Sequence, residues 1–277
     1  MPRLAVLGHP VSHSRSPAMQ NAALARLGLA NWNYEAIDVP TEDFRELVSG
    51  LAGRGFAGVN VTVPHKELAL AVSDRRSEAA GQIGAANTLT FTSAGIEADN
   101  TDAPGLIDAL TEARGLPGEG TVAADRPGLG QSALVLGAGG AARAVVWALA
   151  GEKMQVAVWN RTSARAASLA GEFGAEAIEG QIDPAGFDVI VNASAAGLGG
   201  EDALAELPLQ PSGFRPGQIV ADMVYGAGPG ALVEAARKAG AHTVDGLEIL
   251  VRQGARSLKI WTGQEPDLDV MRKAARS

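Results

Sequence analysis

The chain contains no cysteine and few aromatic residues. Without cysteine, none of its 277 residues can form a disulfide, act as a thiolate nucleophile or bind a metal through a thiolate. Phe, Trp and Tyr make up 4% of the chain and hydrophobic residues as a whole 46%, so we expect a core of Ala, Val and Leu. The absence of cysteine fits a reducing cytoplasm, which is where we expect this protein.

The chain also lacks an excess of positive charge. Its formal net charge is −8 and it has no basic stripe, so we expect no nucleic-acid partner. No signal peptide is expected, because Met1-Pro2-Arg3 leads directly into a short apolar run. The apolar segment 132–150 is long enough to raise the question of a membrane span, but Arg143 and several glycines interrupt it. We therefore expect no membrane insertion.

The same segment has the pattern of a strand, a tight turn and a helix. Ser132–Leu136 is a short apolar run typical of a buried parallel strand, and an Ala-rich helix is expected after the glycines. Gly137, Gly139 and Ala142 fit the G-x-G-x-x-G/A fingerprint of dinucleotide-binding turns, in which the backbone approaches a pyrophosphate at a helix start. Taken alone, the fingerprint also fits a glycine-rich turn that binds no ligand.

The end of the next expected strand, Gln155–Trp159, indicates which dinucleotide would bind. NAD-binding chains usually carry Asp or Glu there to hold the ribose 2′-hydroxyl, whereas this chain has Asn160. Arg161 and Arg165 follow, and guanidinium groups suit a 2′-phosphate. A pair of solvated arginines is the alternative, although cations are disfavoured at a helix start. The pattern therefore favours NADP over NAD.

The first hundred residues alternate expected strands and helices. The strands are expected at Leu4–Leu7, Asn33–Val39 and Gly58–Val63, with a hairpin between about 84 and 102. In the third strand the valines should face one way and Asn60 and Thr62 the other. Lys66 then falls near a helix start, where a cation is poorly placed. Its position therefore indicates either a function or a surface lysine with a small energetic penalty.

Polar residues at two further places, Ser14 with Ser16 and Asp102, could have either a binding role or a role in starting a helix. If residues 14–16 are extended, the hydroxyls of Ser14 and Ser16 point the same way and could hold a carboxylate. Ser16 could equally be an N-cap with Pro17 at the first helical position, and both readings can hold at once. Asp102 likewise could be the N-cap of the helix that contains Leu106.

The second half continues the α/β alternation. A surface loop is expected from Arg114 to Gln131, because it is rich in glycine and also contains proline. The remaining elements are expected as a helix at 163–173, strands at Val189–Asn192, Ile219–Met223 and Ala241–Val244, helices at Gly230–Gly240 and Gly246–Trp261, and a last helix at the C-terminus.

Several separated motifs give the chain a resemblance to the shikimate dehydrogenase family over nearly its whole length. They are Ser12–Pro17, Asn60–Lys66, Gly84–Leu89, Asp99–Asp102, Gly137–Ala141, Asn160–Thr162, Asp222–Tyr225 and Gly246-Leu247 with Gln253. The resemblance implies an α/β fold of two domains with a cleft between them: a substrate-binding domain of residues 1–103 and 238–277, and a Rossmann-type NADP-binding domain of residues 104–237. It implies the NADPH-dependent reversible reduction of 3-dehydroshikimate to shikimate, in aromatic amino-acid and chorismate biosynthesis.

The resemblance also implies roles for individual residues, and it implies no metal. Lys66 and Asp102 would be the catalytic pair, in which Lys66 stabilises the developing alkoxide and supplies a proton while Asp102 orients it. The substrate carboxylate would be bound by Ser14, Ser16 and Tyr225, and the ring hydroxyls by Thr62, Asn87 and Gln253. The cofactor would be bound by Gly137, Ala138, Gly139, Gly140, Ala141, Asn160, Arg161, Thr162, Arg165, Met223 and Gly246.

Three positions depart from the pattern of the family. Ala227, Gly230 and Ile249 stand where the family usually has Pro, Thr and Met, near the expected nicotinamide wall. These departures leave the substrate open, so a relative that acts on quinate or an aminated shikimate is one alternative. An NAD-preferring relative of that kind would be expected to carry an acid in place of Arg161. A non-catalytic NADP-binding regulator is another alternative, and either a monomer or a homodimer is compatible with the sequence.

Overall fold

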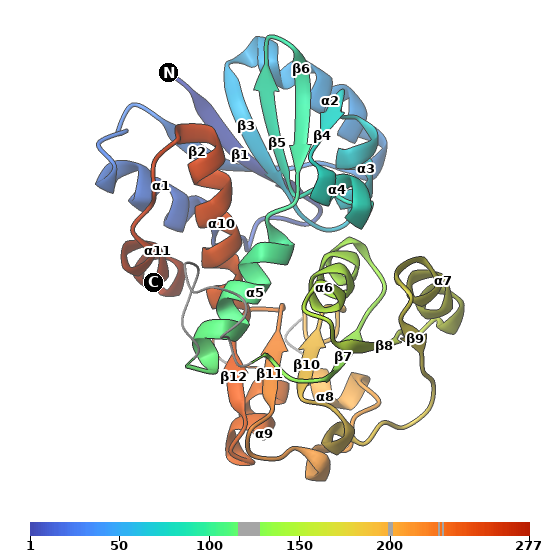
Figure 1. The fold of residues 1–277 in the computed structure, drawn as a ribbon. Helices are drawn as coiled ribbons and strands as arrows, with labels where there is room; N and C mark the ends of the chain where they lie inside the picture. The colour runs from blue at the N-terminus through green and yellow to red at the C-terminus, as the bar shows by residue number, and fades with distance from the viewer. Residues whose placement is uncertain (116–127, 199–201, 227, 229) are drawn as a thin grey trace. The chain divides into compact units, whose positions relative to one another are not determined.

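Two six-stranded sheets, one in each of two units, form the framework of the protein in a computed structural model (Figure 1). The structure describes residues 1–115, 128–198, 202–226, 228 and 230–277. One unit consists of Met1–Asp102 with Leu250–Ser277, and the other of Ala103–Ile249. Each sheet is covered by helices and each unit has its own hydrophobic core, so the fold is the two-domain α/β arrangement predicted from the sequence.

The sheet of the first unit has the order β2-β1-β3-β5-β6-β4. Its strands are β1 (Arg3–Gly8), β2 (Asn33–Asp38), β3 (Phe56–Val61), β4 (Arg75–Arg76), β5 (Thr88–Thr92) and β6 (Gly95–Asp99). Its helices are α1 (Ser16–Arg26), α2 (Phe44–Leu51), α3 (Lys66–Ala71), α4 (Glu78–Ile83), α10 (Gly246–Thr262, from Leu250 onward) and α11 (Leu268–Arg276). β1, β2 and β3 are parallel, whereas β5 runs antiparallel to both β3 and β6.

Alternation along β3 determines what each face of this sheet contacts. Val59 and Val61 join the core that includes helices α2 and α3, whereas Asn60 on the opposite face reaches helix α10. α10 also approaches the strand closely at Gly58, where an added Cβ would lie 2.1 Å from Nε1 of Trp261. A glycine is therefore required there for the helix to pack against the sheet.

The end of β3 and the start of α1 differ from what the sequence indicates. β3 ends at Val61 instead of Val63, because Thr62 and the exposed Val63 lie in the following turn. Residues 14–16 are not extended, since Arg15 has helical dihedrals (φ −82°, ψ −7°). Ser16 is the first residue of α1 rather than its N-cap, and its N–H donates to Oγ of Ser14 at 3.3 Å.

The sheet of the second unit is parallel throughout, in the order β12-β11-β10-β7-β8-β9. Its strands are β7 (Ser132–Leu136), β8 (Gln155–Trp159), β9 (Glu176–Ala177), β10 (Val189–Asn192), β11 (Ile219–Asp222) and β12 (His242–Val244). Its helices are α5 (Asp102–Ala113, from Ala103 onward), α6 (Gly140–Gly151), α7 (Ser163–Phe173), α8 (Ala203–Glu206) and α9 (Ala231–Lys238). The strand order reverses at β7, whose neighbours are β8 and β10, and such switch points are where α/β sheets bind ligands.

Some elements of the second half differ from their predictions, and some predicted residues lie outside the described ranges. Residues 116–127 of the expected loop, and Ala227, lie outside the described residues. The expected helix at Gly230–Gly240 is shorter, α9, and the short helix α8 was not predicted. β12 pairs with β11 in the second unit, although residues 238–249 were predicted to belong to the substrate-binding domain. No helix within the described ranges is both long enough and apolar enough to span a membrane.

Candidate active site

Lys66 is held at the start of helix α3 in the first unit. The chain reaches it from β3 through the turn at Thr62–His65, and its backbone carbonyl accepts from the N–H of Ala86 at 2.9 Å. Its side chain is only 10% exposed, and Nζ lies 2.7 Å from Oδ2 of Asp102. A buried lysine at a helix start is costly unless it is paired, and Asp102 supplies that pairing.

Asp102 is the first residue of helix α5, and its two carboxylate oxygens have different partners. Oδ2 accepts from Lys66, and Oδ1 accepts from Nδ2 of Asn87 at 2.9 Å. The backbone N–H of Asp102 donates to Oδ1 of Asn100 at 3.1 Å, which holds the start of the helix. The carboxylate side chain is 5% exposed, so the ion pair is shielded from water.

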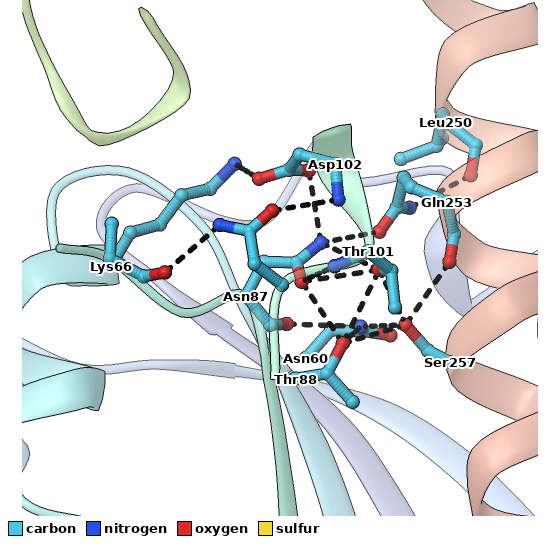
Figure 2. Close-up of polar contacts among 11 residues, drawn as sticks. Asn60, Lys66, Asn87, Thr88, Thr101, Asp102, Leu250, Gln253 and Ser257 are labelled. Atoms are coloured by element: carbon cyan, nitrogen blue, oxygen red, sulfur yellow. Dashed lines mark hydrogen bonds and ion pairs between the residues drawn. The ribbon is translucent and has the colours of Figure 1, made fainter. Parts of the chain in front are cut away.

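Asn87 connects this pair to helix α10. Its Oδ1 accepts from the backbone N–H of Thr101 at 2.8 Å, which directs Nδ2 toward Asp102 and toward Oε1 of Gln253 at 3.0 Å. Nε2 of Gln253 in turn donates to the carbonyl of Leu250 at 2.8 Å. Figure 2 shows that Lys66, Asp102, Asn87 and Gln253 form one connected group, although they come from separate motifs.

Three other candidates in the first unit are not joined to this group. Ser14 is half-buried and Ser16 is buried at the start of α1, while Thr62 lies in the turn after β3. Among the described contacts of the first unit, no hydrogen bond connects these three residues to Lys66, Asp102, Asn87 or Gln253. Their expected part in carboxylate and hydroxyl binding stays a prediction.

The glycine turn of the second unit has the form that its fingerprint predicts. Gly137 has φ +123°, and a Cβ there would lie 2.7 Å from the carbonyl oxygen of Ala193, so only glycine fits. Gly139 precedes helix α6, and a Cβ there would meet nothing within 4 Å. Ala138, Gly140 and Ala141 are half-buried in the same turn. The open side at Gly139 and the amides of the helix start fit the pyrophosphate of a dinucleotide.

The predicted 2′-phosphate residues follow β8. Arg161, Thr162 and Arg165 are exposed, and Nδ2 of Asn160 donates to the carbonyl of Thr162 at 2.9 Å. Nη2 of Arg165 lies 3.3 Å from the carbonyl oxygen of Ala138, which places this guanidinium beside the glycine turn. Exposed guanidinium groups are the kind of donor that suits a 2′-phosphate, and their part in cofactor binding stays a prediction.

Met223 directly follows β11, which ends at Asp222 and not at Met223 as predicted, and Gly246 is the first residue of α10. The N–H of Met223 donates to the carbonyl of Asn192 at 2.9 Å, and a Cβ on Gly246 would lie 2.6 Å from the carbonyl oxygen of Val224. Gly246 is thus packed against the segment that follows Met223. Tyr225, two residues further on, is half-buried in the same segment.

Sequence reasoning singled out neither Asp222 nor Asn192 as site residues. Asp222 is 2% exposed, and its Oδ1 accepts from Nδ2 of Asn192 at 2.9 Å and from the N–H of Val224 at 3.0 Å. Burial raises the pKa of the Asp222 carboxyl to about 6. The available signal was an acid at the carboxyl end of an apolar strand, directly before Met223.

The sequence motifs also did not identify the hydroxyl side chains around Asn87 as part of the site. Thr88, Thr101 and Ser257 are buried behind it, together with Asn60. The only sequence signal for Ser257 was its position one helical turn after Gln253, on the same face of α10. Among the described residues, no group of three or more His, Asp or Glu side chains gathers that could hold a metal ion.

Comparison with known proteins gives one consistent result. Models described as shikimate dehydrogenase substrate binding domain, shikimate / quinate 5-dehydrogenase and shikimate 5′-dehydrogenase C-terminal domain match residues 6–89, 124–196 and 246–276. A shikimate dehydrogenase (NADP(+)) of Methanocella arvoryzae is 42% identical over 98% of this chain and 97% of its own. The shikimate 5-dehydrogenase of Thermus thermophilus, solved with NADP(H) and shikimate, is 41% identical and superimposes with a TM-score of 0.86, covering 100% of this chain and 99% of its own.

The same fold also occurs in a reductase with a different name. The 5-ketofructose reductase of a Gluconobacter species, solved in a ligand-free form, is 28% identical with a TM-score of 0.83 and covers 99% of this chain and 97% of its own. The fold alone therefore does not specify the substrate. The family models and the level of identity do specify the family: this chain belongs to the shikimate dehydrogenase family.

Proposed function

We propose that this protein catalyses the NADPH-dependent, reversible reduction of 3-dehydroshikimate to shikimate, a step of chorismate and aromatic amino-acid biosynthesis. The observation that carries the proposal is the buried ion pair between Lys66 and Asp102, with Asn87 and Gln253 beside it. The proposal is supported by the family to which this chain belongs and by relatives that are named for this activity.

In the proposed reaction Lys66 and Asp102 are the catalytic pair. Reduction of a ketone creates negative charge on its oxygen, and the ammonium of Lys66 would stabilise that charge and donate a proton to it. Asp102 would hold Lys66 in place and accept from a substrate hydroxyl. NADPH supplies the hydride when it is bound. Because the pair is shielded from water, its charges act more strongly than they would at the surface.

The remaining predicted residues are assigned to binding. For the substrate, Ser14, Ser16 and Tyr225 would hold the carboxylate, while Thr62, Asn87 and Gln253 would hold ring hydroxyls. For the cofactor, the turn at Gly137–Ala141 would hold the pyrophosphate and the segment from Asn160 to Arg165 the 2′-phosphate, with Met223 and Gly246 at the nicotinamide. We therefore assign NADP binding to the second unit, which includes residues 238–249, and substrate binding to the first unit, Met1–Asp102 with Leu250–Ser277.

A steady-state assay of shikimate oxidation, followed by the appearance of NADPH absorbance, tests the proposal. Shikimate and quinate are compared with NADP+ and NAD+ in all four combinations. We expect the highest kcat/KM for shikimate with NADP+. A higher value for quinate would assign the chain to the other activity of this family. Tight NADPH binding without turnover of either substrate would instead indicate a regulator.

We also propose that the protein works in the cytoplasm as a monomer or a homodimer. The absence of cysteine from the chain is consistent with a reducing compartment. Light scattering coupled to size-exclusion chromatography, over a range of concentrations, would decide the oligomeric state. A larger assembly would contradict this part of the proposal.

A further inference from the structure

Three buried hydroxyl groups lie behind Asn87, and the proposed reaction assigns no role to them. Thr88 begins β5, Thr101 precedes α5, and Ser257 projects from α10; their exposed fractions are 1%, 3% and 0%. Oγ of Ser257 lies 2.8 Å from Oγ1 of Thr88 and 3.0 Å from Oγ1 of Thr101 (Figure 2). Thr88 and Thr101 lie 3.4 Å from each other, so each of them makes its closer hydroxyl contact with Ser257.

The direction of each hydrogen bond follows from the groups that can only donate or only accept. Nδ2 of Asn60 donates to the carbonyl of Asn87 at 3.1 Å and to Oγ of Ser257 at 2.8 Å. Oδ1 of Asn87 only accepts, and Thr88 donates to it at 3.1 Å. Ser257 has two acceptors for its one hydrogen, the carbonyl of Gln253 at 3.1 Å and Oγ1 of Thr88 at 2.8 Å, and we assign the hydrogen to the nearer one. Thr88 then accepts from Ser257, and Ser257 accepts from Thr101.

The result is a closed ring of hydrogen bonds that begins and ends on one side chain. Nδ2 of Asn87 donates to Thr101 at 2.9 Å, Thr101 donates to Ser257, Ser257 to Thr88, and Thr88 back to Oδ1 of Asn87. Thr101 also lies 3.1 Å from Oδ1 of Asn87, but that oxygen already accepts from the backbone N–H of Thr101 at 2.8 Å and from Thr88 at 3.1 Å, which occupies both of its lone pairs. The ring gives every hydroxyl one donated bond.

We propose that Ser257 is a positioning residue: it closes this hydroxyl ring and thereby holds the carboxamide of Asn87 with its NH₂ group directed at Asp102. This inference rests on the proposed function, because it assigns to Ser257 the orientation of groups that would act on shikimate. Ser257 touches neither Lys66 nor Asp102 and acts through Asn87.

The need for such a ring comes from competition at Asn87. Its NH₂ group has two hydrogens but three acceptors within 3.0 Å, on Thr101, Asp102 and Gln253. Without the ring, the carboxamide could tilt toward one acceptor and leave Oδ1 of Asp102 without its donor. Networks of this kind gain their rigidity from complete pairing, and losing one member leaves buried partners unsatisfied.

The first test is Ser257→Ala in the full-length protein. We expect kcat/KM for shikimate to fall about tenfold while the KM for NADP+ is unchanged, because only the first unit is disturbed. The matched control is Thr262→Val, which removes another hydroxyl of α10 that donates to a carbonyl four residues earlier, as Ser257 can do to Gln253. An equal loss in both variants would mean that only the helix was weakened and would overturn the proposal.

A second pair of variants remains informative if Ser257→Ala folds poorly. Thr88→Val keeps the shape of the side chain but breaks the ring, whereas Thr88→Ser keeps the hydroxyl. We expect the valine variant to lose activity like Ser257→Ala and the serine variant to recover most of it. Similar activities of the two Thr88 variants would overturn the proposal.

A readout without turnover separates this inference from the proposed function. In protein with isotope-labelled asparagine, the side-chain amide signal of Asn87, assigned by its absence in Asn87→Ala, should be slow to exchange in the wild type and faster in Ser257→Ala. An unchanged exchange rate would reject the positioning role even if shikimate is turned over. Faster exchange in Ser257→Ala, together with a wild type that does not oxidise shikimate, would reject the proposed function but support the hydroxyl ring.

Discussion

The two units of this protein present polar groups in opposite ways. In the first unit, Lys66, Asp102 and Asn87 are buried and joined to one another by hydrogen bonds of 2.7 and 2.9 Å. In the second unit, Arg161 and Arg165 are exposed, and the glycine turn offers main-chain amides at an open helix start.

The difference matches two different tasks. An anionic cofactor carries its charge before it binds, so exposed guanidinium groups and amides suffice to hold it. A charge that develops only during reaction is stabilised best by groups that are already oriented and shielded from water. We therefore expect substitutions in the first unit to change kcat and substitutions in the second unit to change the KM of the cofactor.

Lys66→Ala should produce the largest effect. Loss of the proposed proton donor should lower kcat by about 10²–10⁴-fold with a small change in the KM of shikimate. Circular dichroism should accompany the assay, because Asp102 loses its ion-pair partner and the stability should also fall. Lys238→Ala, on the exposed side of α9, is the control. Near wild-type turnover of Lys66→Ala would remove the basis for assigning the chemistry to this unit.

Arg161→Ala should act on the cofactor alone. Loss of a charged hydrogen bond of roughly 1.5–3 kcal/mol should raise the KM for NADP+ and leave the KM for NAD+ nearly unchanged. The exposed Arg45 of the first unit provides a control of equal charge in Arg45→Ala. If the KM values of both cofactors rise equally, Arg161 does not contact a 2′-phosphate.

Two glycines of the same turn should separate folding from binding. Gly137→Ala should destabilise the fold by about 1–3 kcal/mol in urea titrations, because of its positive φ and the close carbonyl of Ala193. Gly139→Ala should leave stability within about 0.5 kcal/mol, since its Cβ would meet open space, yet weaken NADP+ binding. Equal stability of the two variants would contradict the role of Gly137.

Asp222→Asn should give the smallest effect. Asp222 is a buried polar group of the second unit, and its burial disfavours the charged form of its carboxyl. Burial raises the pKa of Asp222 from 3.8 to about 6, so between these values the folded state holds a proton that the unfolded chain releases. Stability from this group is present at low pH and falls as the pH rises through about 6. We expect the stability of the variant relative to the wild type to rise by about 2 kcal/mol between about pH 4 and pH 7 in urea unfolding.

Asp188→Asn is the control with the opposite sign. Hydrogen bonds from the N–H of Gln131 and other donors lower the pKa of Asp188 below 3.8. Its contribution is therefore present above that value and lost as the pH falls. This variant should lose stability at neutral pH and approach the wild type in acid. If both variants showed the same pH dependence, the pKa of Asp222 would not be raised.

The sequence predicts most of the fold but fewer of the local details. Regular patterns identify β7, β8, β10 and α7 with their observed bounds, because each has a strong apolar periodicity and clear turn residues. The end of β3 was misplaced, because alternation continues through Val63 although the chain has already turned. Of the two readings of Ser16, the N-cap is wrong, because α1 already includes this residue, although Ser-Pro is a common helix start.

What the sequence by itself determined is the set of chemical groups: the glycine turn, the two arginines after β8, and a lysine and an aspartate in motifs far apart. Tertiary structure alone decided how these groups are oriented. Asn60 and Ser257, which fix the network around Asn87, are 197 positions apart in the chain. The physical reason is that hydrogen bonds depend on distance and direction between atoms, and these exist only after β3, β5 and α10 have packed together.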